Sequence, residues 1–139
     1  MPRVCKVLIV ENDDFVRELL GEVFDHEGFL FTTVRNGREM EDKLDEDDYD
    51  IAVIDIGLPG DKDGFVLGDI ARGQGCGVIL VTGDHRHAPR LEQSGHFYLL
   101  KPFRMGELMT IVDRILAMAS IECIRRKRSD GSVFPLRGA

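Results

Sequence analysis

The chain has 139 residues, of which 43% are hydrophobic and 31% are charged, and its formal net charge is −7. This length supports one domain with a hydrophobic core and hardly two. The negative charge disfavours nonspecific binding to nucleic acid by the whole domain. No apolar run approaches the roughly 18 residues that a membrane-spanning helix needs.

The start of the chain and its cysteines predict where the protein works. A strand-like run follows almost directly after Met1, so we expect no signal peptide. The three cysteines, Cys5, Cys76 and Cys123, are odd in number, far apart and without the spacing of metal ligands. We therefore expect neither a disulfide scaffold nor a zinc site, and a reducing cytoplasm as the location.

Strands and helices are predicted to alternate along the chain. Apolar runs rich in β-branched residues predict strands over residues 4–10, 29–34, 49–56, 78–82 and 97–100. Apolar residues spaced by three and four predict helices from about residue 15 to 27, over 38–45, 65–72 and 88–93, and from 103 onward. Gly28 is the expected stop of the first helix.

Five such alternations predict an α/β fold, in which a parallel sheet carries helices on both faces. Right-handed crossovers place the carboxyl ends of all parallel strands on one edge. That edge collects the polar residues that follow or end the strands, namely Glu11, Asn12, Asp55, Thr82 and Lys101. A ligand site is expected there, because open α/β sheets bind ligands at this edge.

These residue types suit phosphoryl chemistry. Carboxylate and amide oxygens are the ligands that Mg²⁺ prefers. A carboxylate such as Asp55 can also attack a phosphoryl group and form an acyl phosphate. A lysine ammonium, a threonine hydroxyl and a divalent cation would neutralise the charge on the phosphoryl oxygens. Each residue alone is a weak signal, but the ordered set is a strong one.

The same residues lie in stretches that resemble the receiver domains of bacterial two-component response regulators. The matching stretches are Val7-Leu8-Ile9-Val10-Glu11-Asn12-Asp13, Val53-Ile54-Asp55-Ile56-Gly57-Leu58-Pro59, Asp63-Gly64, Val81-Thr82-Gly83 and Lys101-Pro102-Phe103. The resemblance covers about residues 4–119. It implies a (βα)5 flavodoxin-like, doubly wound sheet with strand order 2-1-3-4-5.

The resemblance also implies a metal-assisted phosphoacceptor. Asp55 matches the residue that takes a phosphoryl group from a sensor histidine kinase or a histidine phosphotransfer protein. Glu11, Asn12 and Asp55, with the backbone carbonyl of Gly57, match the positions that hold Mg²⁺. The chain would then catalyse only its own phosphorylation and dephosphorylation, so it is not expected to be an enzyme acting on other substrates.

Three further positions match residues that respond to the phosphoryl group. Thr82 and Lys101 match the residues that contact its oxygens, and Tyr98 matches an aromatic that changes rotamer on activation. The Lys101-Pro102 peptide bond is expected to be cis, as in the family. A downstream protein would bind the face formed by the fourth helix (88–93), the fifth strand (97–100) and the fifth helix.

The chain departs from the family pattern at the second acidic position, which is Asn12 here. Metal affinity would fall with the lost charge, unless Asp13 compensates; a helix-cap role explains Asp13 as well. A pseudo-receiver that binds partners without phosphorylation is therefore an alternative. A metal-dependent phosphohydrolase is a second one, although Gly57 stands where such enzymes typically carry an acidic residue. His85 and His87 are expected in a solvated loop without a role.

The domain is expected to occupy residues 1–120. Residues 121–139 carry five basic residues against two acidic ones, with several turn-forming residues, and predict a basic C-terminal helix extension or a flexible tail. Ile121 and Ile124 are candidates to prolong the last helix and support a homodimer. No DNA-binding domain and no membrane contact are expected.

Overall fold

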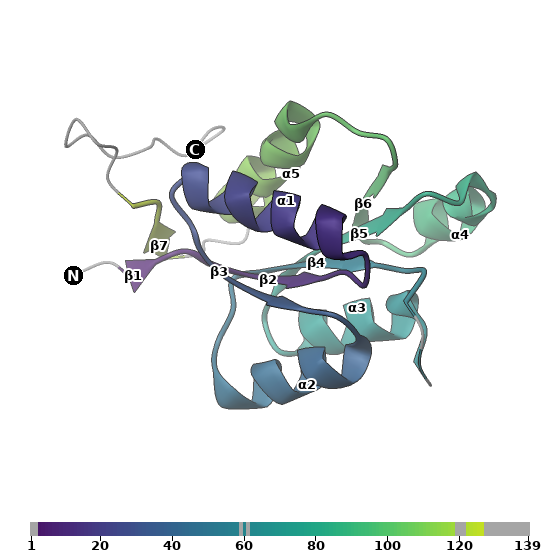
Figure 1. Ribbon diagram of the computed structural model, residues 1–139, viewed down its shortest axis with the longest axis horizontal. Helices are drawn as coiled ribbons and strands as arrows, with labels where there is room; N and C mark the ends of the chain where they lie inside the picture. The colour runs from purple at the N-terminus through teal and green to yellow at the C-terminus, as the bar shows by residue number, and fades with distance from the viewer. Residues whose placement is uncertain (1–2, 59, 61, 119–121, 127–139) are drawn as a thin grey trace.

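The computed structural model describes residues 3–58, 60, 62–118 and 122–126. Its centre is a five-stranded parallel sheet in the order β3-β2-β4-β5-β6 (Figure 1). The strands are β2 (Lys6–Val10), β3 (Leu30–Val34), β4 (Ile51–Asp55), β5 (Gly77–Thr82) and β6 (Phe97–Leu100). Counted along the chain, these strands have the order 2-1-3-4-5, which confirms the doubly wound α/β fold expected from the sequence.

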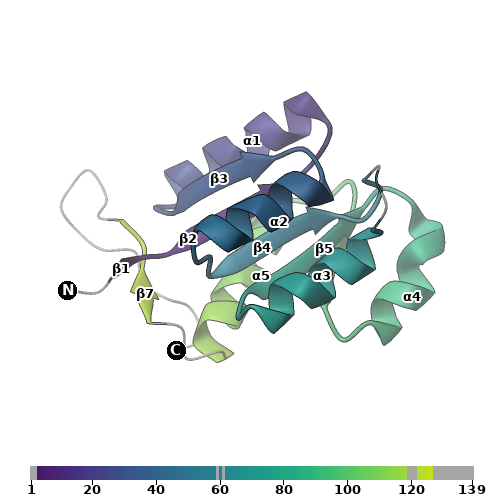
Figure 2. The same cartoon turned by 90° about the horizontal axis from the view of Figure 1, so that it is seen from below.

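Helices cover both faces of this sheet. Figures 1 and 2 show α1 (Asp14–His26) and α5 (Met105–Met118) on one face, and α2 (Gly37–Glu46) and α3 (Gly64–Gly73) on the other. The short helix α4 (Ala88–Gln93) follows a 3₁₀ turn, η1 (His85–His87). Among the described residues, no helix has the length and apolar character to cross a membrane.

The three inner strands β2, β4 and β5 are buried on both faces, and alternate residues point to opposite layers. The layer under α1 and α5 contains Val7, Ile9, Val53, Ile79 and Val81. The layer under α2 and α3 contains Leu8, Val10, Ala52, Ile54 and Leu80. This arrangement explains why the strands read as continuous apolar runs rather than as alternating ones.

Side-chain caps fix where the helices begin at the carboxyl edge of the sheet. Asp13, Asn36 and Asp63 accept hydrogen bonds from the backbone N–H groups three residues on, over 3.0, 2.9 and 2.9 Å. Each bond satisfies a donor that the first helical turn leaves free. Gly28 follows α1 with a positive φ of 89°, as expected of a helix stop. The caps place the helix starts beside the strand ends.

Four large apolar helix residues lie outside the core. The exposed fractions are 75% for Phe15, 38% for Leu19, 43% for Val66 and 67% for Met118, the last residue of α5. The spacing of three and four in the sequence predicts an inward face of α3 that consists of Val66, Leu67, Ile70 and Ala71, and for Val66 this prediction is wrong. The apolar stripes of α1 and α3 are wider than the strip that the sheet covers, so their outer members face solvent.

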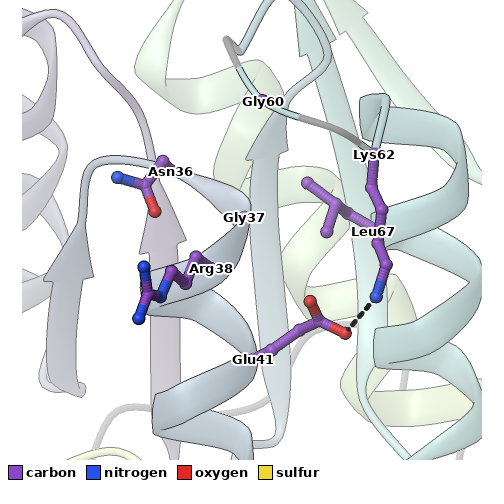
Figure 3. Close-up of a pocket in the computed structure, with 7 residues that line it drawn as sticks. All are labelled: Asn36, Gly37, Arg38, Glu41, Gly60, Lys62 and Leu67. Carbon is purple, nitrogen blue, oxygen red and sulfur yellow. Dashed lines mark hydrogen bonds and ion pairs between the residues drawn. The ribbon is translucent and has the colours of Figure 1, made fainter.

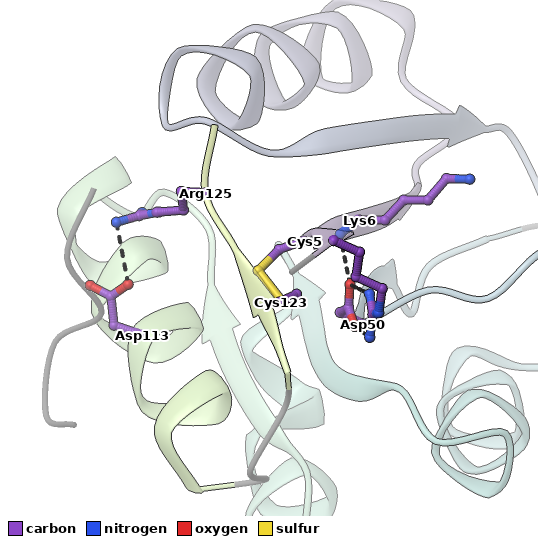
Figure 4. The surroundings of a disulfide bond; sticks show 7 residues. Cys5, Lys6, Asp50, Asp113, Cys123 and Arg125 are labelled. Carbon is purple, nitrogen blue, oxygen red and sulfur yellow. Dashed lines mark hydrogen bonds and ion pairs between the residues drawn. A yellow bond between two sulfur atoms is a disulfide. The ribbon is translucent and has the colours of Figure 1, made fainter. Parts of the chain in front are cut away.

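A second, two-stranded sheet joins the two ends of the described chain. It pairs β1 (Arg3–Val4) with β7 (Cys123–Ile124) in parallel register. Cys5 and Cys123 form a disulfide with a Cα–Cα distance of 4.8 Å (Figure 4). The prediction that no disulfide forms is therefore wrong. Ile124 lies in a strand, so its predicted place in a prolonged last helix is wrong too; Ile121 and residues 127–139 lie outside the described residues.

The segment that carries β7 is held by buried charge as well as by the disulfide. Arg125 is 4% exposed and makes an ion pair with Asp113 at 3.6 Å (Figure 4). It makes a second ion pair with Glu27 at 3.2 Å. Its guanidinium also lies over the Phe29 ring, 4.9 Å from the centroid. A buried charge is tolerated only when it is paired in this way. The basic tail thus begins as part of the folded domain.

Candidate functional site

The polar residues predicted to converge do meet at the carboxyl edge of the sheet. Glu11 directly follows β2, Asp55 ends β4 and Thr82 ends β5. Lys101 follows β6, and its backbone N–H donates to the Thr82 carbonyl over 2.8 Å. Since all four strands are parallel, the four residues share one rim of the sheet.

Lys101 joins the two carboxylates of this rim. Its Nζ lies 2.8 Å from Glu11 Oε1 and 3.4 Å from Asp55 Oδ2. The Lys101-Pro102 bond that follows is cis, as predicted. Residues 11, 55 and 101 are far apart in the sequence, so only the parallel topology brings them together. The site therefore combines two carboxylates and one ammonium within contact distance.

Burial and proximity perturb the ionisation of this group. Burial raises the pKa of Glu11, and the nearby Asp55 carboxylate adds to this, while the hydrogen bonds from Lys101 and from the Asp13 backbone act against it. Burial alone would lower the pKa of Lys101, but the hydrogen bond to Glu11 and the charges of Asp55 and Glu11 outweigh it and raise that pKa. Glu11 and Lys101 are thus held together by the attraction of their opposite charges in a partly desolvated site.

We expect Lys101→Met, in the absence of divalent cations, to destabilise the protein by about 1–3 kcal/mol at neutral pH. The variant removes the partner of a buried carboxylate, which raises the pKa of Glu11 further above its ordinary 4.5. A group whose pKa is higher in the folded protein than in the unfolded protein stabilises the fold fully at any pH below its unfolded pKa. This stabilisation is lost as the pH rises through its folded pKa. Denaturant unfolding in a chelator should therefore show a difference from the wild type that is small below pH 4.5 and grows toward neutral pH. A difference independent of pH would contradict this account of the Glu11–Lys101 pair.

The loop after β4 orients the Asp55 carboxylate. The Gly57 N–H donates to Asp55 Oδ1 over 2.8 Å, while Oδ2 faces Lys101. A Cβ at position 57 would stand 3.3 Å from Oδ1, a tight contact. Gly57 therefore lets the backbone approach the carboxylate closely.

The oxygens at this rim fit a hard divalent cation. Glu11 and Asp55 supply two carboxylates that both contact Lys101. Asn12 and Gly57 are exposed in the loops that follow these strands, and their oxygens could complete a donor set. Among the described residues, no group of three or more His, Cys, Asp or Glu side chains could hold a metal. Asp13, the other acidic residue here, caps α1 through Val16. A cation would thus rely on two carboxylates and on neutral oxygens, a donor set that Mg²⁺ accepts.

Thr82 is held by the loop that follows it. Its side chain is buried, and its Oγ1 accepts from the Asp84 N–H at 3.0 Å and lies 3.3 Å from His87 Nδ1. His85 Nε2 lies 3.2 Å from the Lys101 carbonyl oxygen. The prediction that His87 sits in a solvated loop is wrong, because this ring is half-buried against Thr82. Asp84 caps η1 by accepting from the Arg86 N–H, and His87 is the last residue of this turn.

Tyr98 lies in β6 opposite Leu80 and is half-buried in the layer under α2 and α3. Its position between the sheet and the helices agrees with a strand aromatic, and its role as a switch remains a prediction.

A separate hollow lies beside the rim, between the start of α2 and the loop that precedes α3 (Figure 3). It is lined by Asn36, Gly37, Arg38, Glu41, Gly60, Lys62 and Leu67. An ion pair of 2.8 Å between Lys62 and Glu41 crosses it. None of the residues that line this hollow is Glu11, Asp55, Thr82 or Lys101, so the hollow is separate from the candidate site at the rim.

Comparison with known proteins agrees with this geometry. An open parallel sheet with an acidic pair and a lysine at its carboxyl edge defines a ligand-binding α/β domain. Residues 7–113 match the family described as the response regulator receiver domain. The chain therefore belongs to the receiver domains of two-component response regulators.

Two curated relatives share about a third of the aligned residues. The transcriptional regulatory protein GltR of Pseudomonas aeruginosa is 32% identical over 126 residues, which are 86% of this chain and 52% of GltR. The aerobic respiration control protein ArcA of Escherichia coli is 33% identical over 106 residues, which are 73% of this chain and 44% of ArcA. The chain thus spans about half the length of the curated relatives it matches.

Solved structures share the fold. The response regulator TrrA of Thermotoga maritima, in complex with Mg²⁺-BeF, has a TM-score of 0.73 and 28% identity, covering 81% of this chain and 100% of TrrA. The receiver domain of Francisella response regulator 1452 has a TM-score of 0.70 and 28% identity, covering 84% of this chain and 98% of that domain.

Proposed function

We propose that this chain is a phosphorylation-controlled binding module. Asp55 takes a phosphoryl group from a phosphohistidine of a sensor histidine kinase or of a histidine phosphotransfer protein, with Mg²⁺ as the cofactor. The observation that carries this proposal is the position of Lys101 Nζ, which contacts both Glu11 and Asp55. The proposal places the protein in the cytoplasm, and the chain acts on no other substrate.

The residues of the rim divide the work of the transfer. An Asp55 oxygen forms a bond to phosphorus while the bond from phosphorus to the donor imidazole breaks, and the imidazole nitrogen keeps the electron pair. Lys101 and Thr82 stabilise the charge on the phosphoryl oxygens. Glu11, Asn12 and Asp55, with the Gly57 carbonyl, hold Mg²⁺, which supplies further charge neutralisation when it is bound.

A solved relative and an exposed surface support this assignment. TrrA is described as a complex with Mg²⁺-BeF, which supports the proposal that Mg²⁺ assists the reaction of this chain. Phe15 stands in the first turn of α1, two residues past the Asp13 cap, and is 75% exposed. A large exposed aromatic beside a reaction site is typical of a protein-docking surface. We assign to Phe15 and Leu19 a contact with the phosphodonor protein.

The output of the module is a change of partner affinity. Phosphorylation adds charge and acceptor oxygens at Asp55, and movement of Thr82 and Lys101 toward them would bias the loop after β5 and Tyr98. The face made by α4, β6 and α5 would then bind a downstream protein or a second copy of the chain.

The proposal is tested by incubating the protein with acetyl phosphate, with Mg²⁺ or with a chelator, and measuring the intact mass. We expect one phosphoryl group with Mg²⁺, removable by hydroxylamine as an acyl phosphate is, and at least a tenfold slower reaction in the chelator. Absence of labelling by acetyl phosphate and by a panel of histidine kinases would overturn the proposal. The pseudo-receiver, to which neutral Asn12 points, would then be the function, and a Mg²⁺ titration would show no binding.

A further inference from the structure

The Thr82 hydroxyl can donate one hydrogen bond and accept two. A hydroxyl carries one proton and two acceptor lone pairs. The Asp84 N–H already uses one lone pair, at 3.0 Å. A phosphoryl oxygen is an acceptor, so Thr82 can contact it only by donating its single proton.

His87 competes for that proton. Its Nδ1 lies 3.3 Å from Thr82 Oγ1, and in the tautomer that carries the ring proton on Nε2 this nitrogen is an acceptor. A contact between Oγ1 and this acceptor nitrogen can form only if Thr82 donates, so the proton of Thr82 is then directed at His87. The same proton cannot serve a phosphoryl oxygen until this contact breaks.

The His87 ring is held in place from its other side. The Phe65 ring meets it edge-on, with centroids 6.4 Å apart and an interplanar angle of 84°. Phe65 is itself buried near the start of α3, and the Arg90 guanidinium of α4 lies 3.9 Å from its centroid. Arg90 is anchored in turn to Asp63 at 3.0 Å. The ring thus lies between the end of β5 and the first turns of α3 and α4.

We infer that His87 carries its ring proton on Nε2 and is a positioning residue that latches the Thr82 hydroxyl in the unphosphorylated protein, an inference that rests on the proposed function. Phosphorylation of Asp55 would draw the hydroxyl away from His87 and so release the residue that immediately precedes α4. The latch thereby connects the rim to the helix at the proposed output face. Its strength is that of one neutral hydrogen bond, so removing it should favour the activated arrangement by about fivefold.

The test compares the wild type with two variants of His87 and one control variant. His87→Leu removes the ring nitrogen. His87→Asn places an amide near the position of Nδ1 and can restore the bond. His85→Leu is the matched control, because His85 contacts the Lys101 carbonyl and not the hydroxyl of Thr82. The affinity of each protein for beryllofluoride in the presence of Mg²⁺ is measured by titration.

We expect His87→Leu to bind beryllofluoride about fivefold more tightly than the wild type. The affinities of His87→Asn and His85→Leu should be close to that of the wild type. An unchanged or weaker affinity in His87→Leu would reject the latch while leaving the proposed function intact. Failure of the wild type itself to bind beryllofluoride would reject the proposed function and the latch together.

A spectroscopic measurement tests the contact without any phosphoryl group. The ring nitrogens of His87 are followed by ¹⁵N NMR in the wild type and in Thr82→Val. We expect a shift of Nδ1 in this variant and no comparable shift at His85. Equal spectra for His87 in the two proteins would show that the hydroxyl does not bond to the ring, and would overturn the inference.

Discussion

Replacing Asp55 by Asn is expected to abolish labelling by acetyl phosphate, with a loss of about a thousandfold or more in rate. The amide has nearly the shape of the carboxylate and can still accept from the Gly57 N–H, so the loop after β4 keeps its support. An amide oxygen, however, is a poor nucleophile toward phosphorus. Intact-mass measurement over time in the presence of Mg²⁺ follows the reaction directly.

The matched control for this variant is Asp13→Asn. Asp13 is an acidic neighbour of the rim, but its side chain caps α1, and asparagine is an equally good cap. Labelling of Asp13→Asn should therefore stay close to that of the wild type. A phosphoryl group found on the Asp55→Asn protein would refute the assignment of the acceptor, and loss of labelling in both variants would point to a general effect of charge at the rim.

Loss of the Cys5–Cys123 disulfide is expected to lower the free energy of unfolding by about 2–4 kcal/mol. The bond joins residues 118 apart in the sequence, so it removes much of the freedom of the unfolded chain. Both cysteines are buried, and the bond holds β7 against β1. A typical domain has a total stability of only about 5–15 kcal/mol, so this loss is a large share.

Denaturant unfolding with and without dithiothreitol measures this effect. The double variant Cys5→Ser, Cys123→Ser should resemble the reduced wild type and should not respond to the reductant. Cys76→Ser should retain the response, because Cys76 lies apart from the bond as a buried free thiol whose pKa is raised to about 11, chiefly by burial. Equal stability of the wild type in oxidising and reducing buffer would contradict the expected contribution of the disulfide.

The disulfide between Cys5 and Cys123 stands against the expectation of a reducing cytoplasm, and a thiol titration tests both. Disulfides are uncommon in cytoplasmic proteins of most organisms. Titration of free thiols in protein purified under an alkylating agent would show which state the cell maintains. One reactive thiol after unfolding corresponds to the bonded form, and three correspond to the reduced form.

The carboxyl edge of the sheet was predictable because the signals for it are local. Asp55, Thr82 and Lys101 each stand at the end of an apolar run, and parallel topology then determines that their strand ends meet. The strand order itself followed from resemblance and not from periodicity. The assignment of Asp13 to a helix cap could not be separated from a metal role until its bond to Val16 was seen.

The remaining features depend on contacts between distant residues. Nothing in the spacing of Cys5 and Cys123 signals that β1 and β7 pair. Arg125 looks like part of a solvated basic run, yet Asp113 and Glu27 make its burial possible. His87 was assigned to solvent because a loop residue gives no local sign of the direction in which its ring points. These are tertiary effects that override the local pattern.

The Cys5–Cys123 disulfide also determines how the domain would respond to mechanical tension. It lies next to the start of β2, at the opposite end of this strand from the rim that carries Glu11, Asp55 and Lys101 (Figure 4). A force applied between positions 5 and 123 would be carried by a covalent link and not by the hydrogen bonds of the sheet. Single-molecule stretching between these positions should therefore extend the oxidised protein very little, whereas reduction should expose the whole enclosed chain to the load.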